Sequence, residues 1–114
     1  MREEDQRPFR LADWLGALTP ENEHYAIAFE HGTLEVGVYA PRGVDPQSPH
    51  TRDEVYVVVR GRGLFRRGEH AAPFGPGDLL FIPAGEIHRF EQFSDDFAAW
   101  VVFYGPEGGE RDHA

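Results

Sequence analysis

The chain has 114 residues, the common size of one domain, so two independent domains are excluded. The 11 Lys and Arg against 20 Asp and Glu give a net charge of −9 at pH 7, which repels nucleic-acid phosphates. No Cys is present, so disulfides, thiolate metal sites and a Cys nucleophile are excluded. We find neither an apolar leader nor an apolar run long enough to cross a membrane. We therefore expect a soluble, cytoplasmic protein without nucleic-acid or membrane partners.

The first predicted element is one short helix in an N-terminal segment over residues 1–20. Leu11, Trp14, Leu15 and Leu18 recur at the spacing of one helical face, and Thr19-Pro20 ends the pattern. The 13 Gly and 9 Pro favour short strands joined by turns in the rest of the chain. Apolar runs predict strands over residues 25–29, 33–39, 54–60, 64–67, 79–82, 87–93 and 98–104. We expect a β-barrel over residues 21–105 and a flexible tail over residues 106–114.

Two segments between these strands carry the side chains best suited to bind a metal ion. Residues 41–49 contain three prolines and one glycine, so this loop is stiff and extended, and it leads to His50 and Glu54. His88 follows a Pro-x-Gly turn after the strand at 79–82. If the two strands lie beside or face each other, two imidazoles and one carboxylate meet. Such a set leaves coordination positions open for water, oxygen or a chelating substrate.

These residues resemble the two motifs of the cupins, a family of small jelly-roll barrels. The segment Ser-Pro-His-Thr-Arg-Asp-Glu at residues 48–54, with Gly61 beyond it, matches the later part of the first motif, G-x5-H-x-H-x3,4-E-x6-G. The second motif, G-x5-P-x-G-x2-H-x3-N, is matched by Gly77, Pro83, Gly85 and His88, with Gln92 at the Asn position. The short segment between Gly61 and Gly77 suits single-domain bacterial members of the cupin-2 type.

The resemblance implies an all-β fold, the double-stranded β-helix of a cupin jelly-roll barrel, here with a short N-terminal helix. It also implies a divalent metal ion, Fe, Mn, Zn or Ni, bound by His50, Glu54 and His88. The first histidine of the family motif falls on Ser48, whose hydroxyl is a weak ligand. Gln47, in the Pro-Gln-x-Pro-His-x-x-Asp-Glu variant of this loop, is a candidate replacement through its amide oxygen.

Strand alternation predicts the side chains that share the cavity with the metal ion. Tyr56 falls on the face of Glu54, and we expect it to act as an auxiliary proton donor. The expected substrate wall takes residues from the faces of Glu54 and His88 and from neighbouring strands: Val58, Phe81, Phe90, Gln92 and Trp100.

Three classes of function are consistent with the predicted fold and metal-binding residues. The first is a metal-binding enzyme acting on a small organic molecule, either a dioxygenase or a metal-assisted isomerase, lyase or decarboxylase, as the resemblance to cupins implies. The second is a cupin that binds or senses a small ligand without catalysis, which the loss of the first motif histidine favours. A metal-free structural barrel is a third. Strands that are apolar on both faces predict a homodimer, as is common in the family.

Overall fold

The structure, a computed structural model, describes residues 7–46 and 48–111. No helix in these two ranges is long and apolar enough to span a membrane. The elements in chain order are α1 (Leu11–Leu15), the 3-10 helix η2 (Pro20–Asn22), β1 (Tyr25–His31), β2 (Leu34–Tyr39), β3 (Asp53–Arg60), β4 (Gly63–Arg67), β5 (His70–Phe74), β6 (Leu79–Ile82), β7 (His88–Glu91) and β8 (Ala98–Tyr104).

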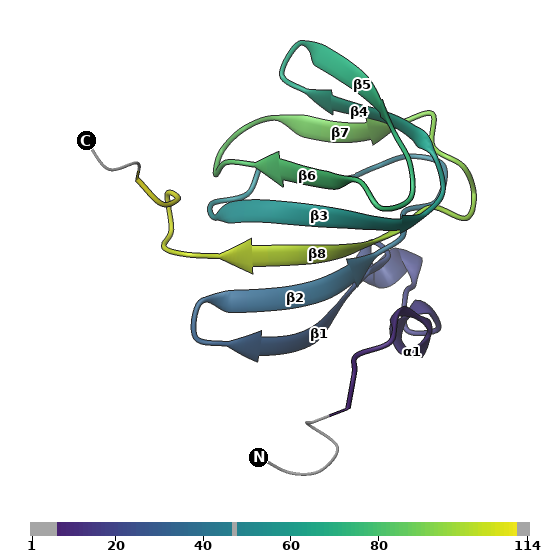
Figure 1. The fold of residues 1–114 in the computed structure, drawn as a ribbon, viewed down its shortest axis with the longest axis horizontal. Helices are drawn as coiled ribbons and strands as arrows, with labels where there is room; N and C mark the ends of the chain where they lie inside the picture. The colour runs from purple at the N-terminus through teal and green to yellow at the C-terminus, as the bar shows by residue number, and fades with distance from the viewer. Residues whose placement is uncertain (1–6, 47, 112–114) are drawn as a thin grey trace.

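The strands form two antiparallel sheets. Five strands pair in the order β1-β2-β8-β3-β6, and three pair in the order β5-β4-β7 (Figure 1). One buried cluster takes side chains from both sheets, including Tyr56 and Ile82 from the larger sheet and Phe65 and Phe90 from the smaller one. The two sheets therefore enclose a single core, and the expected all-β jelly-roll barrel is confirmed.

Strand β3 illustrates how the sequence pattern positions the site. Its burial alternates, with Glu54, Tyr56 and Val58 in the interior while Val55 and Val57 lie on the opposite face. A strand turns successive side chains to opposite faces, so the carboxylate that opens β3 points into the same interior as the core residues that follow it.

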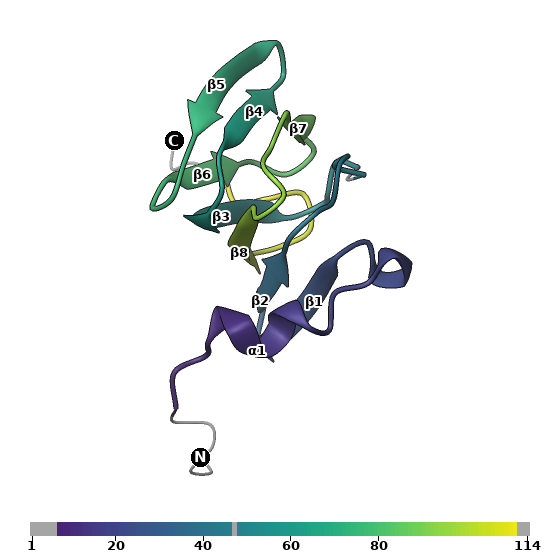
Figure 2. The ribbon, with the colours of Figure 1, turned by 90° about the vertical axis from the view of Figure 1, so that its right-hand side faces the viewer.

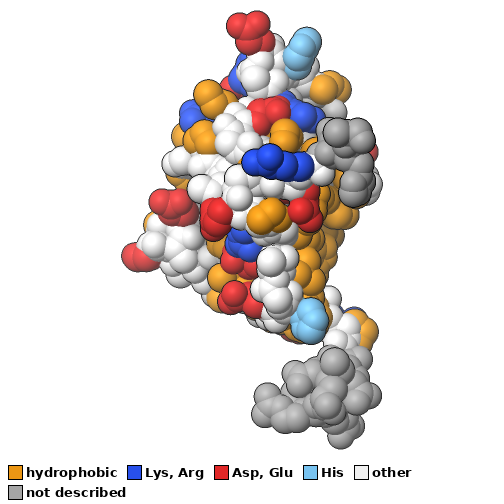
Figure 3. Space-filling model, turned by 90° about the vertical axis from the view of Figure 1, so that its left-hand side faces the viewer, with side chains coloured by type: hydrophobic (Ala, Val, Ile, Leu, Met, Phe, Trp, Pro, Cys, Tyr) orange, Lys and Arg blue, Asp and Glu red, His pale blue; other side chains and the backbone are white. Residues whose placement is uncertain are grey.

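The outer face of the five-stranded sheet is apolar as well. Of its residues, Leu79 is 64% exposed and Phe81 is 42% exposed. Hydrophobic side chains gather along the right-hand border of Figure 3, the side that faces the viewer in Figure 1. Cross-strand pairing builds two outer apolar rows, one of Val36, Val102, Val55 and Phe81 and the other of Val38, Trp100, Val57 and Leu79.

Two elements differ from the sequence-based expectation. The helix ends at Leu15 rather than continuing to Leu18, because Gly16, a poor helix former, is its C-cap. The separate helix η2 then begins after Thr19, whose side chain accepts from the backbone amide of Asn22. Strand β5 was not expected, since its Ala and Pro residues have low strand propensity. It pairs only with β4 at the edge of the smaller sheet, where a proline such as Pro73 is tolerated.

The N-terminal segment packs on the β1–β2 end of the larger sheet. Figure 2 shows α1 beside this hairpin, far from β5. The ring of Phe9 stacks on that of Phe29 in β1, with 4.6 Å between the ring centroids, and also contacts Trp14. This end of the outer face is therefore partly covered by the chain itself.

The segment after β8 returns to the site-bearing loop. The Gly108 amide donates to the Thr51 carbonyl at 2.6 Å, and the Glu110 amide donates to the Asp53 carboxylate at 2.8 Å. These bonds tie the start of the segment expected as a flexible tail, while residues 112–114 lie outside the described residues.

Candidate metal centre

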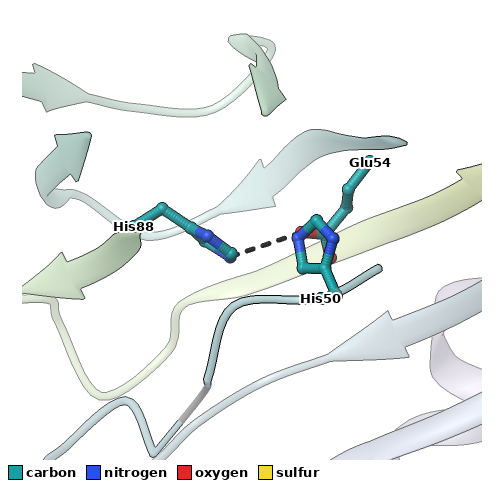
Figure 4. Close-up of side chains that lie close together, drawn as sticks. All are labelled: His50, Glu54 and His88. Carbon is teal, nitrogen blue, oxygen red and sulfur yellow. Dashed lines mark ion pairs between the residues drawn. The ribbon is translucent and has the colours of Figure 1, made fainter. Parts of the chain in front are cut away.

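Three side chains from separate segments meet in the interior. His50 comes from the loop before β3, Glu54 from β3 and His88 from the first position of β7, and all three point toward one another in Figure 4. One nitrogen or oxygen atom of each lies within 4.8 Å of the others. His88 Nε2 is 3.3 Å from Glu54 Oε1, and His50 Nε2 contacts the same oxygen. The expected convergence of these residues is present in the fold.

Buried hydrogen bonds hold the loop and β7 together. The carboxylate of Asp45, 1% exposed, accepts from the Tyr39 hydroxyl at 2.5 Å and from the Phe90 amide at 2.8 Å. The His50 carbonyl accepts from the Gly85 amide at 2.7 Å, in the turn just before β7. The proline-rich loop is thereby fixed against the strand that carries His88.

Both imidazoles are oriented by backbone carbonyls. Nδ1 of His50 lies 2.6 Å from the Arg52 carbonyl oxygen, and Nδ1 of His88 lies 3.1 Å from the Glu86 carbonyl oxygen. A carbonyl only accepts, so in the neutral rings the hydrogen resides on Nδ1 and each Nε2 directs a lone pair toward Glu54. This is the tautomer and orientation that second-sphere carbonyls impose on metal-binding histidines.

The ligand atoms that meet at this point have no hydrogen between them. Within the described residues, His50 Nε2 and both carboxylate oxygens of Glu54 are buried without a hydrogen-bond partner. A buried carboxylate facing two lone pairs is costly unless a positive charge lies between them. Two imidazole nitrogens and one carboxylate form a ligand set for a divalent transition metal, so the residues fit such an ion.

The charges of the cluster are coupled. Burial acts to raise the pKa of Glu54, but His50 and His88 outweigh it and hold that pKa below its ordinary value. Burial acts to lower the pKa of His88, but the Glu54 carboxylate, aided by the Glu86 carbonyl, raises that pKa above its ordinary value. A proton on the cluster therefore competes with a metal ion for the same lone pairs.

A cavity of about 240 Å³ adjoins the cluster. It is smaller than the roughly 300–1,000 Å³ of pockets that hold drug-sized ligands, so its size suits a small molecule. The lining residues come from β1, β2, β3, β8 and the loops before β1 and β3: Glu23, Tyr25, Tyr39, Ser48, His50, Glu54, Val101 and Phe103.

Comparison with known proteins identifies the family. The Cupin domain (Cupin_2) family matches residues 35–104, which is more than half of the chain. This chain belongs to the cupin family.

Two curated relatives and one solved structure illustrate the range of similar cupins. An uncharacterised protein of Streptomyces coelicolor is 33% identical over 103 residues, covering 89% of this chain and 98% of that protein. An acireductone dioxygenase of Pseudomonas savastanoi pv. phaseolicola is 33% identical over 95 residues, covering 69% of this chain but 52% of that enzyme. A crystal structure from Rhizobium leguminosarum bv. viciae, of unknown function, has a TM-score of 0.68 at 23% identity, covering 87% of this cupin and 96% of that chain. This cupin thus spans about half the length of the dioxygenase that it matches.

Tyr56 lies at the edge of the candidate metal centre of this cupin. Its hydroxyl oxygen is 3.3 Å from His88 Nε2, and the side chain is fully buried. The ring also packs edge-on against Phe90, at 4.9 Å between centroids. Strand alternation therefore located a phenol within reach of the three clustered side chains.

One departure from the family motif, Ser48, lies at the cavity. Ser48, at the position of the first family histidine, is exposed and lines the cavity beside His50. Gln47, the candidate replacement ligand, lies outside the described residues.

The expected substrate wall is placed elsewhere. None of its five members lines the cavity beside His50. Val58 and Phe90 are packed in the core, whereas Phe81 and Trp100 lie on the outer face of the larger sheet. Gln92 follows the end of β7 at a φ of 49°, where strand alternation no longer holds, and it is exposed. Tyr25 and Tyr39, which do line the cavity, were not both expected there. They pair across β1 and β2 and so share one face of the sheet, and this pairing could have indicated that Tyr25 joins the wall.

Proposed function

We propose that this cupin is a metal-dependent enzyme that acts on a small organic molecule, with His50, Glu54 and His88 as the ligands of one divalent cation. The observation that carries the proposal is the Glu54 carboxylate, which is 0% exposed, has no hydrogen-bond partner among the described residues, and faces Nε2 of both histidines. A divalent ion in this position supplies Lewis-acid polarisation of a substrate oxygen or, when redox-active, electron transfer to dioxygen.

The protein groups around the cluster suit proton transfer and the exclusion of water. Tyr56 holds a phenolic proton next to His88 Nε2, so it can donate to a substrate oxygen that gains negative charge during the reaction. Phe103 and Val101 supply apolar cavity wall, which lowers the local dielectric and strengthens each charge interaction there.

The reaction class that we propose is dioxygenation or a metal-assisted isomerisation, lyase reaction or decarboxylation. Similarity to the acireductone dioxygenase supports the first of these, although it covers only half of that enzyme. Three protein ligands would leave the ion with open coordination positions, which could take a substrate and, in a dioxygenase, oxygen.

The decisive experiment is elemental analysis of protein purified without an affinity tag, followed by calorimetric titration of metal-free protein with Fe(II), Mn(II), Ni(II) and Zn(II). We expect one ion per chain in the parent and loss of binding in His50→Ala and His88→Ala. His70→Ala, at an exposed position of β5, is the matched control and retains binding. Equal binding by all four proteins would overturn the assignment.

A non-catalytic ligand-binding cupin is the second candidate, because exposed Ser48 replaces the first motif histidine. Oxygen uptake and product formation in metal-loaded protein, measured across a panel of carboxylates, sugar acids and phenols, separate the two. Tight binding of a panel member without turnover of any member would favour the binding protein.

A further inference from the structure

The cavity beside the metal centre combines hydrogen-bond acceptors with a lack of cationic side chains. Its described lining residues include Glu23, Tyr25, Tyr39 and Ser48, of which Glu23 is exposed, but no Arg. The chain contains no Lys at all. A ligand carboxylate or phosphate remote from the metal ion would therefore meet negative charge and lone pairs rather than a counter-charge.

The arginine nearest to this wall is already neutralised. The Arg52 guanidinium donates to the Thr33 carbonyl at 2.8 Å and to Glu35 Oε1 at 3.1 Å, and it lies 5.6 Å from the centre of the Phe103 ring. These bonds use two of the five N–H groups of Arg52, and Glu35 balances its charge, so an anionic ligand would have to compete with the Glu35 carboxylate for this guanidinium.

The carboxylate of Glu35 also fixes the position of the phenolic proton of Tyr25. The Tyr25 hydroxyl donates to Glu35 Oε2 at 2.8 Å, while Glu35 Oε1 accepts from Arg52. The ring lies against Gly37 in β2, where a Cβ atom would come within 2.5 Å of it. With its hydrogen committed to Glu35, the phenolic oxygen presents a lone pair as an acceptor for a ligand donor.

Charge balance at the metal centre also disfavours a ligand with a second anionic group. A divalent cation together with the Glu54 carboxylate retains one positive charge, which a single deprotonated chelating oxygen of a ligand neutralises. A second anionic group on the ligand would have no partner in the cavity. The volume of about 240 Å³ also limits the ligand to a small molecule.

We infer that the cavity selects a small, oxygen-chelating molecule such as an enediol, hydroxyketone or catechol, whose remaining groups are neutral or cationic hydrogen-bond donors, and that Tyr25 and Glu23 are its specificity-determining residues. The inference rests on the proposed function, because the chelating oxygens need the metal centre. It excludes dicarboxylates and phosphorylated compounds from the substrate class.

The test uses zinc-loaded protein and three catechols that share the chelating group. 4-Methylcatechol is neutral, dopamine carries an ammonium group, and 3,4-dihydroxybenzoate carries a carboxylate. Dissociation constants come from calorimetry under nitrogen, because zinc is redox-inert and the readout is then binding without turnover. We expect the neutral and cationic probes to bind at least tenfold more tightly than the anionic probe. Equal or tighter binding of 3,4-dihydroxybenzoate would overturn the inference.

Two variants assign the selectivity to residues. Glu23→Gln should reduce the discrimination against 3,4-dihydroxybenzoate at least threefold, whereas Glu21→Gln, which is exposed and does not line the cavity, should not change it. We expect the parent to bind dopamine more tightly than 4-methylcatechol, because the ammonium group can donate to the Tyr25 oxygen. Tyr25→Phe should remove this difference, whereas Tyr104→Phe should keep it. Unchanged ratios in Glu23→Gln and Tyr25→Phe would overturn the roles of these residues.

A zinc titration of each protein comes first. Absence of zinc binding by the parent would overturn the proposed function and this inference together. Zinc binding by the parent with equal affinity for all three catechols would overturn the inference alone. Melting temperatures of the variants establish that each one is folded.

Discussion

The carboxylate of Asp45 accepts a hydrogen bond at 2.8 Å from the amide of Phe90, two residues beyond His88 in β7. Asp45 belongs to the loop that delivers His50, so one buried side chain spans the two segments that carry the imidazoles. The distance between the histidines therefore depends on a residue that does not belong to the cluster itself.

Asp45→Ala should weaken both folding and metal binding. The substitution leaves the Tyr39 hydroxyl and the Phe90 amide without this buried acceptor, which costs about 2–4 kcal/mol in the free energy of unfolding. We expect zinc affinity to fall roughly tenfold or more, as for other groups that orient metal ligands. Chemical denaturation and zinc titration check these outcomes, with exposed Asp95→Ala as the control. Unchanged zinc affinity in folded Asp45→Ala would show that the loop is positioned by other contacts.

The stability of metal-free protein should depend on pH through Glu54 and His88. The lowered pKa of Glu54 contributes stability above its unfolded value of about 4.3, and this contribution is lost as the pH falls. The raised pKa of His88 contributes stability that is complete below its unfolded value of about 6.5 and is lost as the pH rises through the folded value. The pair therefore stabilises metal-free protein most between about pH 4.5 and 6.5.

Thermal unfolding across pH 4 to 9 measures this dependence. Between pH 6.5 and 9 the melting temperature of the metal-free parent should fall, because the stability contributed by protonated His88 is lost. The melting temperature of His88→Gln should not show this fall. Zinc affinity should rise over the same range, because protons no longer occupy the ligand atoms. A parent and a His88→Gln variant with parallel pH profiles would contradict the coupling.

The sequence predicted much of the fold and the convergence of the three clustered side chains, for local reasons. Apolar runs mark β3 and β8, and His50, in the loop before β3, is only four residues from Glu54 near the start of that strand. Strand β5 was missed because its Pro and Ala residues form a strand only through pairing with β4. Pairing with β4 thus outweighs the low strand propensity of these residues.

The cavity wall was not predictable by the same reasoning. Alternation applies within one strand, and it ended at β7 before reaching Gln92. Apart from the motif residues Ser48, His50 and Glu54, most of the wall comes from β1, β2 and β8, strands that the motifs do not include. Tyr25 reaches it because Gly37 lacks a side chain in the neighbouring strand, a relationship that appears only once the register of the two strands is known.

Gly37→Ala should displace Tyr25 and alter the cavity. A Cβ atom at this position would lie 2.5–2.6 Å from the Cε1, Cζ and hydroxyl oxygen of Tyr25, so the ring must move. We expect a loss of about 1–3 kcal/mol in the free energy of unfolding, typical of overpacking. Gly16→Ala is the control, because nothing lies within 4 Å of its added methyl group and its φ is −71°. Parental stability and parental catechol affinity in Gly37→Ala would contradict this account.

We propose, finally, that a second copy of this chain covers the β3–β6 end of the outer apolar rows. Leu79 is 64% exposed and Phe81 is 42% exposed on the edge strand β6, and the residues paired with them on β3 are Val57 and Val55. The four side chains carry no charge, so their burial adds no like-charge contact, and a two-fold axis would place the patch against its own copy. Light scattering after size-exclusion chromatography should give a dimer for the parent and a monomer for Val57→Glu. Val44→Glu, 70% exposed on the loop before β3, should remain dimeric. A monomeric parent, or a dimeric Val57→Glu, would exclude this interface.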